Sequence, residues 1–289
     1  MRQDISGKTR VIGLLGWPVS HSMSPAMHNP AFEAAGLDFV YVCFPVPPEK
    51  LKGAVSGYRA LSVAGSNVTI PHKSAVMEHL DKISEEARKI GAVNTIVNRD
   101  GKLSGYNTDV NGFLLSLKNK NVEVKGSRVV IIGAGGVSRA IAFGAAMNGA
   151  SSITLTDIEK SRAESLGASL SSSFENLPVS IPDHGSEELL REIAEADIIA
   201  NATPLGMKSE DPLPLSEKQL NSLSPDVVIF DAVYSVQGTK LQRILEEKNI
   251  LYIGGLDMLL YQGVKAFELW TGQTPDVDLM RKVLYGKLG

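Results

Sequence analysis

Short apolar runs alternate along the chain with longer stretches in which apolar residues recur at helical spacing. The runs of strand length are Val11–Leu15, Phe39–Phe44, Gly65–Ile70, Ala92–Asn98, Lys102–Tyr106, Arg128–Ile132, Ser152–Thr156, Ile198–Asn201, Val227–Asp231 and Leu251–Ile253. The helical stretches include Pro25–Ala35, Leu51–Ala60, Lys73–Leu80, Ser84–Ile90, Asp109–Asn119, Val137–Asn148, Ser161–Ser171 and Asp257–Trp270. This alternation predicts an α/β fold with mainly parallel sheets. The turn dipeptide Asp100-Gly101 predicts a hairpin between two of the strands.

Two features of this pattern indicate where the chain divides. Arg128–Ile132 is a continuous β-branched run, as a strand buried on both faces requires, and the polar stretch 119–127 precedes it. We therefore expect two α/β domains. Residues 1–111 form the first, with helices in 257–289 returning to it, and residues 112–256 form a Rossmann-like second domain. The active site should be the cleft between them.

Composition and charge narrow the classes of protein to consider. The 289 residues are 43% hydrophobic and 21% charged, which is enough apolar material for two buried cores. A net charge of −3 gives no basic field for nucleic acid or an anionic membrane. Cys43 is the one cysteine, so no internal disulfide can form. Without an apolar signal core or a membrane-length run, a soluble, cytoplasmic protein is expected.

A glycine-rich turn follows the strand at Arg128–Ile132 and opens a helix. Residues without a Cβ let the backbone approach a pyrophosphate, and the helix N-terminus supplies free N–H groups. The residues of this predicted dinucleotide site are Gly133, Ala134, Gly135, Gly136 and Val137. Ser138 replaces the third glycine of the usual fingerprint.

Asp157 ends the next strand, where a carboxylate can accept hydrogen bonds from the ribose hydroxyls of NAD. The same charge would repel the 2′-phosphate of NADP. Lys160 and Arg162 lie nearby and could meet that phosphate, but we favour the plainer explanation that they belong to a solvated helix start. The alternative for the whole region is a tight turn followed by a helix-capping aspartate.

Polar side chains also gather at the ends of the N-terminal strands, which is where open α/β sheets bind ligands. They include Ser22, Ser24, Asn67, Thr69, Lys73, Asn94 and Asp109. Hydroxyls, amides, a lysine and an aspartate suit a polyhydroxylated acid. Each residue has a plainer explanation: Ser24 and Asp109 could cap helices, Lys73 could be a surface lysine, and Asn67 could satisfy loop backbone. The clustering at strand ends favours a binding site.

Seven ordered motifs resemble those of the shikimate dehydrogenase family, and together they cover nearly the whole chain. They are Gly65–Lys73, Gly91–Thr95, Gly105–Asp109, Gly133–Gly136, Asn201–Met207, Asp231–Tyr234, and Gly255–Leu259 with the following Gln262-Gly263 and Trp270–Gly272. The resemblance implies a nicotinamide-dependent oxidoreductase that interconverts 3-dehydroshikimate and shikimate in aromatic amino-acid and chorismate biosynthesis. Some members of the family also oxidise quinate.

The resemblance also implies roles for individual residues. Lys73 and Asp109 match the catalytic pair. In that pair the lysine ammonium stabilises and protonates the alkoxide, while the aspartate orients the lysine and binds a ring hydroxyl. Ser22 and Ser24 match positions that bind the substrate carboxylate. Positions that contact the ring hydroxyls or the carboxylate are matched by Asn67, Thr69, Asn94 and Gln262, and Tyr234 matches a position near the substrate. Positions lining the nicotinamide are matched by Thr203, Gly255 and Met258, although a methionine often simply fills a core.

One departure from the family bears on the cofactor. Members that use NADP usually carry Asn-Arg-Thr after the second strand of the dinucleotide domain, whereas this chain has Thr156-Asp157-Ile158. We therefore expect NAD to be preferred, with NADP as the alternative, and quinate remains open as a second substrate. Against quinate, the serine pair Ser22 and Ser24 is usual in shikimate-preferring members.

Three other functions remain to be weighed. An NAD-dependent quinate/shikimate enzyme with a catabolic role would share every motif. A non-catalytic sensor of shikimate-like acids would not need Lys73 and Asp109, and a folate-dependent dehydrogenase would leave Ser22, Ser24 and Asp109 without a task. No histidine spacing indicates a metal site. We expect a small-molecule substrate as the partner, no nucleic acid or membrane, and a monomer or homodimer.

Overall fold

The computed structural model describes residues 5–207, 210–234 and 238–286, which divide into two compact units. Residues 5–108 and 260–286 make up the first unit, and residues 109–259 make up the second. The chain therefore leaves the first unit once and returns to it. None of the described helices is both long and apolar enough to cross a membrane.

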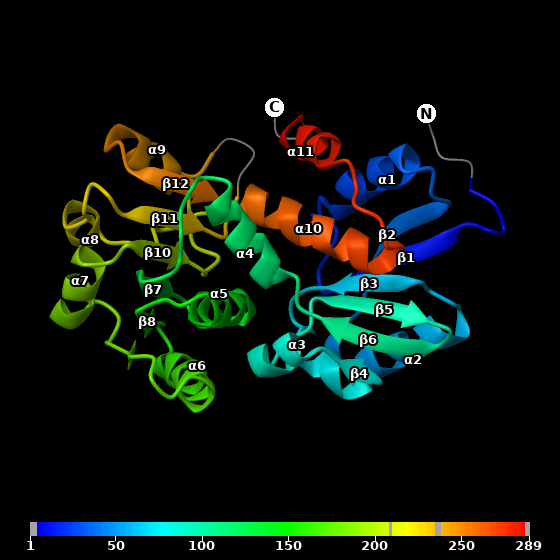
Figure 1. Ribbon diagram of the computed structural model, residues 1–289, viewed down its shortest axis with the longest axis horizontal. Helices are drawn as coiled ribbons and strands as arrows, with labels where there is room; N and C mark the ends of the chain where they lie inside the picture. Colours follow the sequence, from blue (N-terminus) through cyan, green and yellow to red (C-terminus); the bar gives the residue numbers. More distant parts are fainter. Residues whose placement is uncertain (1–4, 208–209, 235–237, 287–289) are drawn as a thin grey trace. The chain divides into compact units, whose positions relative to one another are not determined.

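The first unit is built on a six-stranded mixed sheet in the order β2-β1-β3-β5-β6-β4 (Figure 1). Its strands are β1 (Arg10–Gly16), β2 (Phe39–Pro45), β3 (Gly65–Val68), β4 (Lys82–Ile83), β5 (Thr95–Arg99) and β6 (Lys102–Tyr106). Strand β1 pairs in parallel with β2 and β3, whereas β5 is antiparallel to both of its neighbours. The predicted hairpin at Asp100-Gly101 is confirmed, and both turn residues have positive φ.

Helices cover this sheet with two separate groups of buried side chains. They are α1 (Ser24–Ala34), the short 3-10 turns η1 (Pro48–Lys50) and η2 (Ala75–His79), α2 (Leu51–Ala60), α3 (Glu85–Ile90), the later part of α10 (Gly255–Thr271), and α11 (Val277–Gly286). One group is aromatic, with Phe32 of α1 stacked on Phe39 and Phe267. The other is mainly aliphatic and includes Val55 of α2 and Ile96 of β5.

The second unit contains a sheet of six parallel strands in the order β12-β11-β10-β7-β8-β9 (Figure 1). The strands are β7 (Arg128–Ile132), β8 (Ser152–Thr156), β9 (Val179–Ser180), β10 (Ile198–Asn201), β11 (Val228–Asp231) and β12 (Leu251–Gly254). The chain order reverses between β7 and β10, so the loops that leave these two strands run in opposite directions. This arrangement confirms the predicted Rossmann-like fold.

The connecting helices of the second unit bury a continuous aliphatic core against the sheet. They are α4 (Asp109–Lys118), α5 (Gly136–Met147), α6 (Lys160–Ser173), α7 (Glu187–Ala194), α8 (Glu217–Asn221) and α9 (Lys240–Glu247). Ile193 of α7 and Leu245 of α9 are fully buried in one cluster with Val130 of β7. Near-complete burial on both faces explains why the central strands read as unbroken apolar runs.

One predicted helix is wrong. Lys73–Leu80 was expected to be α-helical, but only the 3-10 turn η2 forms there. The carbonyl of Lys73 accepts a hydrogen bond from the N–H of Val93 at 2.7 Å, so it is unavailable to residue 77. Met77 N–H instead bonds to Ser74 O, three residues back. Pairing with a neighbouring segment therefore overrides local helical periodicity.

Gly65 allows a close contact on which the aromatic core depends. The Trp270 indole N–H donates to Ile96 O at 2.9 Å, and a Cβ at position 65 would lie 2.5 Å from that carbonyl and 2.7 Å from the indole nitrogen. We predict that Gly65→Ala lowers the free energy of unfolding by about 1–3 kcal/mol through overpacking. Urea denaturation measures this change.

The matched control is Gly53→Ala on the exposed face of α2, where no atom lies within 4 Å of the added Cβ. It should raise stability by up to about 1 kcal/mol, because alanine favours helix. Equal effects of the two substitutions would contradict the close-contact argument.

Candidate active site

In the first unit, hydrogen bonds hold the side-chain amide of Asn67, the penultimate residue of β3, in one orientation. Asn67 is buried, and its Oδ1 accepts a hydrogen bond from the Tyr41 hydroxyl at 2.8 Å. Its Nδ2 donates to Thr95 Oγ1 at 3.2 Å and to the carbonyl of Asn94 at 3.3 Å. Because both amide hydrogens are engaged, Asn67 offers its remaining oxygen lone pair, which suits a ligand hydroxyl that donates.

Asn94 lies directly before β5 and fixes the residue that precedes Asp109. Its Oδ1 accepts the backbone N–H of Thr108 at 2.7 Å, and its Nδ2 donates to Thr108 Oγ1 at 3.0 Å. Asp109, the first residue of α4, is itself buried. A carboxylate in a first helical turn is favoured by the helix dipole, so this position suits a charged group.

The two serines after β1 are linked to each other. The Ser24 N–H donates to Ser22 Oγ at 3.2 Å. Ser24 is buried as the first residue of α1, and Met23 occupies the N-cap position without a side-chain cap. The helix-cap explanation of Ser24 is therefore wrong, and its hydroxyl is free of that task.

The other predicted residues of the first unit lie on different elements. Lys73 and Thr69 are half-buried in the segment after β3, and Thr69 N–H bonds to Leu15 O at 2.9 Å. Gln262 is buried on α10. The polar groups described so far thus come from β3 and the segment after it, from the residue before β5, and from the starts of α1 and α4 and the middle of α10.

In the second unit, the glycine-rich turn after β7 has the geometry that an anion-binding loop needs. Gly133 has φ +97°, and a Cβ there would lie 2.9 Å from Thr203 Cγ2. Helix α5 begins at Gly136, so its free N–H groups lie next to the turn. Ser138, at the third glycine position, is buried and its hydroxyl accepts the Gly135 N–H at 3.1 Å. These residues fit a dinucleotide pyrophosphate.

Asp157 joins this turn to the end of β8. Its Oδ2 accepts the N–H of Ala134 at 2.7 Å, and its Oδ1 accepts that of Glu159 at 2.8 Å. Each oxygen keeps a lone pair for a ribose hydroxyl. Both nearby cations already pair with exposed acids, Lys160 with Asp183 at 2.6 Å and Arg162 with Glu159 at 2.7 Å.

A buried polar group at the ends of β10 and β11 was not singled out by the sequence. Asp231 Oδ1 accepts from Asn201 Nδ2 at 2.9 Å and from the Val233 N–H at 3.1 Å, and Oδ2 accepts from the Tyr252 hydroxyl at 3.1 Å. Asn201 Oδ1 in turn accepts the Thr203 hydroxyl at 2.7 Å. Burial raises the pKa of Asp231 to about 6, although the three donors oppose the shift.

The remaining predicted cofactor residues follow β12. Gly255 is buried, and a Cβ there would collide with the carbonyl of Ala232. Met258 is also buried, so the core-filling explanation and the nicotinamide role both fit it. Tyr234, predicted to lie near the substrate, is a half-buried residue of this unit, and burial raises its pKa.

Some of the residues that the sequence analysis missed could have been recognised from the sequence, and others could not. Asn201 and Asp231 each end a buried parallel strand, the same signal that identified Asp157, so the rule could have found them. Tyr41, which holds Asn67, gave no signal because it lies inside an apolar strand. His28, whose ring stacks on Tyr41, gave none because it lies inside a helix. Within the described ranges, no group of three His, Cys, Asp or Glu side chains is placed to hold a metal ion.

Comparison with known proteins identifies the relatives of this chain. The model described as "Shikimate dehydrogenase substrate binding domain" matches residues 14–96, and "Shikimate 5'-dehydrogenase C-terminal domain" matches 255–285. A third, "Alanine dehydrogenase/PNT, C-terminal domain", matches 110–267. A shikimate dehydrogenase (NADP(+)) of Symbiobacterium thermophilum is 45% identical over 281 residues, covering 97% of this chain and 95% of its own. This chain belongs to the shikimate dehydrogenase family.

Solved structures of the family agree with the fold described above. Shikimate 5-dehydrogenase from Listeria monocytogenes, in complex with shikimate and NAD, has a TM-score of 0.91 and 38% identity, covering 98% of this chain and 99% of its own. Quinate dehydrogenase from Corynebacterium glutamicum, in complex with NAD, has a TM-score of 0.87 and 32% identity, covering 96% and 99%. The resemblance inferred from the seven motifs is confirmed.

His28 of α1 supports the tyrosine that holds Asn67, because its ring stacks on Tyr41 at 4.8 Å between centroids. It is fully buried, and neither ring nitrogen has a hydrogen-bond partner. Burial lowers its pKa from 6.5 to about 3. The folded protein therefore holds the ring neutral where the unfolded chain would protonate it, and this share of stability is lost as pH falls from 6.5 towards 3.

We predict that His28→Phe removes this pH dependence. Relative to the variant, the wild type should lose roughly 2–3 kcal/mol of unfolding free energy between pH 6.5 and 4.5, and nothing between pH 7 and 8. Urea denaturation across this range measures the difference. The exposed His184→Phe is the control and should keep the wild-type slope; parallel curves for wild type and His28→Phe would refute the neutral-ring argument.

Proposed function

We propose that this chain catalyses the reversible reduction of 3-dehydroshikimate to shikimate with a nicotinamide cofactor, as a step of aromatic amino-acid biosynthesis. The observation that carries the proposal is the set of polar residues next to the strands of the first unit, together with Asp109 at the start of α4, in a chain of this family. The first unit binds the substrate and the second binds the dinucleotide. The alcohol and carboxylate of shikimate match the hydroxyl and amide groups present.

Lys73 and Asp109 are the proposed catalytic residues. The cofactor, when bound, supplies the hydride that reaches the carbonyl carbon. The Lys73 ammonium stabilises the negative charge on the carbonyl oxygen and gives it a proton. The Asp109 carboxylate accepts a hydrogen bond from a ring hydroxyl and so orients the substrate. Burial strengthens both interactions because fewer waters compete for the charges.

The remaining residues of the proposed substrate set, which lie in the first unit except for Tyr234, hold the substrate in place. Ser22 and Ser24 donate to its carboxylate through their hydroxyls. Asn67 accepts from a ring hydroxyl, since the contacts of its amide hydrogens leave only an acceptor. Thr69, Asn94, Tyr234 and Gln262 complete the proposed substrate set. The proposed cofactor set is Gly133, Ala134, Gly135, Gly136, Val137, Asp157, Thr203, Gly255 and Met258.

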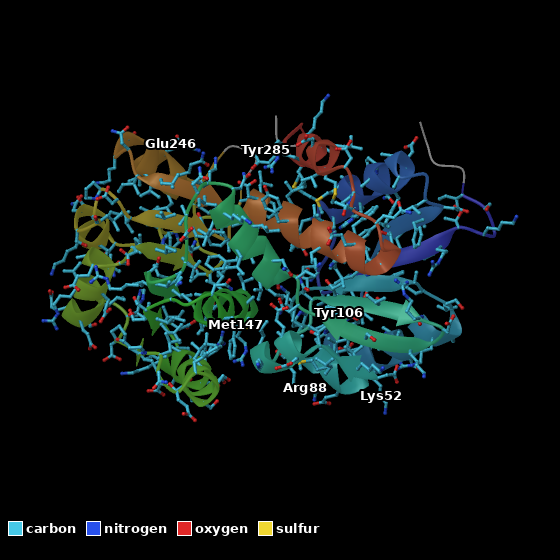
Figure 2. The ribbon with its side chains drawn as sticks, viewed as in Figure 1. Lys52, Arg88, Tyr106, Met147, Glu246 and Tyr285 are labelled. Carbon is cyan, nitrogen blue, oxygen red and sulfur yellow. The ribbon has the colours of Figure 1, made fainter. Side chains whose placement is uncertain are left out.

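We predict that Lys73→Ala lowers kcat for shikimate oxidation by at least about a hundredfold, because it removes the proton-transfer group. Initial rates of the purified protein and variant measure the loss. Lys52→Ala is the control, because Lys52 points outward from α2 (Figure 2) and should leave the rate unchanged. Near-normal turnover of Lys73→Ala would contradict the catalytic assignment.

Oxidation of quinate with NAD is the second candidate activity. Asp157 and the likeness to a quinate dehydrogenase favour it. The same assay with shikimate and quinate, each with NAD and NADP, separates the candidates. A higher kcat/KM for quinate would replace the first proposal, and no turnover of either acid by a folded protein would favour a ligand sensor.

For the cofactor, the residue at the end of β8 and the names of the relatives point in different directions. Curated relatives, including the Symbiobacterium one, are named for NADP(+) and favour that cofactor, whereas the Listeria and Corynebacterium structures contain NAD. We propose that this chain prefers NAD, because the Asp157 carboxylate would face the 2′-phosphate of NADP. The two nearby cations, Lys160 and Arg162, already pair with the acids Asp183 and Glu159.

We predict that Asp157→Asn lowers the ratio of kcat/KM with NAD to kcat/KM with NADP by about tenfold or more. The amide removes the charge that repels the 2′-phosphate and weakens the acceptor for ribose hydroxyls. Steady-state kinetics with both cofactors measure the ratio. Asp197→Asn, which neutralises an exposed aspartate before β10, is the control. An unchanged ratio in Asp157→Asn would show that Asp157 does not select the cofactor.

A further inference from the structure

Asp231 is a buried carboxylate without a cationic partner. It is 1% exposed, and within the described residues no lysine, arginine or histidine pairs with it. Its neighbours are three neutral donors: the Asn201 amide, the Val233 N–H and the Tyr252 hydroxyl. Such donors stabilise the ionised form without neutralising its charge, so a net negative charge remains inside the second unit.

This charge lies next to the residues proposed to line the nicotinamide. Asn201 bonds both to Asp231 and to the hydroxyl of Thr203, so one side chain separates the carboxylate from Thr203. On the other side, the Val233 N–H bonds to Asp231, and the Val233 carbonyl accepts the Gly255 N–H at 3.3 Å. Asp231 therefore sits between the two segments assigned to the nicotinamide.

The nicotinamide ring carries a positive charge when oxidised and none when reduced, whereas the rest of the dinucleotide is the same in both forms. Two unit charges about 12 Å apart, at an effective dielectric constant of about 20, interact strongly enough to change an affinity by roughly tenfold before screening. We propose that the buried carboxylate of Asp231 makes the second unit bind the oxidised cofactor in preference to the reduced one. This inference rests on the proposed function and goes beyond it.

The surroundings of Asp231 allow its charge to be switched by pH. Burial raises its pKa to about 6, so the carboxylate is ionised at pH 7.5 and mainly neutral at pH 5.5. The facing titratable group is Tyr252 of β12, whose pKa burial and Asp231 both raise, so it stays neutral in this range. The charge of Glu246 of α9 also raises the pKa of Tyr252. Thr239, at the start of α9, places its Oγ1 3.3 Å from the Tyr252 hydroxyl. Asn201 of β10 does not titrate.

Asp231→Asn removes the charge while keeping most of the contacts. The asparagine oxygen can still accept from Asn201 and Val233, and its NH2 group can donate to the Tyr252 oxygen. A loss of positioning would weaken both forms of the cofactor together. A loss of charge weakens the oxidised form alone, and this difference separates the two explanations.

The test is equilibrium binding of NAD+ and NADH to the full-length wild type, Asp231→Asn and Asp197→Asn at pH 7.5. The expected result is a rise of about fivefold in Kd(NAD+)/Kd(NADH) in Asp231→Asn, from a partly screened charge. Asp197→Asn changes the net charge equally and should leave the ratio unchanged. The inference is overturned if the ratio in Asp231→Asn stays constant or if both constants shift by one factor.

The wild type alone supplies a second measurement that does not depend on folding of the variant. Between pH 7.5 and 5.5, Kd for NAD+ should rise by about two- to threefold relative to Kd for NADH as Asp231 takes up a proton. The NAD pair is used because it lacks the 2′-phosphate, which itself titrates in this range. A pH-independent ratio would overturn the inference, whereas failure of the wild type to bind NAD and NADP in either form would overturn the proposed function.

Discussion

The buried parallel strands of the second unit carry their charged and amide side chains where they begin or end, and this constraint organises the unit. Four of its strands finish on a polar or glycine residue that contacts its neighbours: Gly133 after β7, Asp157 after β8, Asn201 in β10 and Asp231 in β11. The strand order reverses between β7 and β10, so the loops part there and leave backbone N–H groups accessible. The Gly133 turn, in close contact with Thr203, sits at that point.

The first unit follows the same rule with a different result. Its buried amides engage most of their hydrogen-bonding capacity within the protein, as Asn67 does with Tyr41 and Thr95. Leaving such groups unsatisfied would cost free energy, so their orientation is largely decided before any ligand arrives. A ligand then meets a fixed pattern of donors and acceptors. Selectivity among similar polyhydroxylated acids can arise from this pattern, because a misplaced hydroxyl leaves a buried partner unpaired.

Features that depend on chain-local chemistry were predictable from the sequence. The parallel sheet of the second unit, the turn at Gly133 and the hairpin at Asp100-Gly101 all follow from residue types in short windows. Features that depend on distant partners were not. The segment after Lys73 does not form the predicted α-helix, because the Val93 N–H bonds to the Lys73 carbonyl that the helix would need. Likewise, the hydrogen bond of Tyr41 to Asn67 joins two different strands. The assigned roles of the site residues come from resemblance and await the kinetic tests.

Charge at the cofactor end of the second unit also depends on tertiary structure. Asp231 could be recognised in the sequence as a strand-ending carboxylate, but not as one enclosed by neutral donors. Its burial and its raised pKa emerge only when β10, β11 and β12 lie side by side. The motif Asp231–Tyr234 therefore does not by itself predict the burial or the pKa of Asp231, which depend on the three strands around it.

The return of the chain to the first unit has a consequence for synthesis on the ribosome. The Trp270 indole bonds to the carbonyl of Ile96, 174 residues earlier, and closes the aromatic core of that unit. Residues 5–108 emerge early yet cannot complete this core until Trp270 has left the exit tunnel, whereas residues 109–259 are contiguous. The later-made unit can thus finish folding first, and the earlier one spends that interval with apolar surface exposed, the condition that makes folding intermediates prone to aggregation.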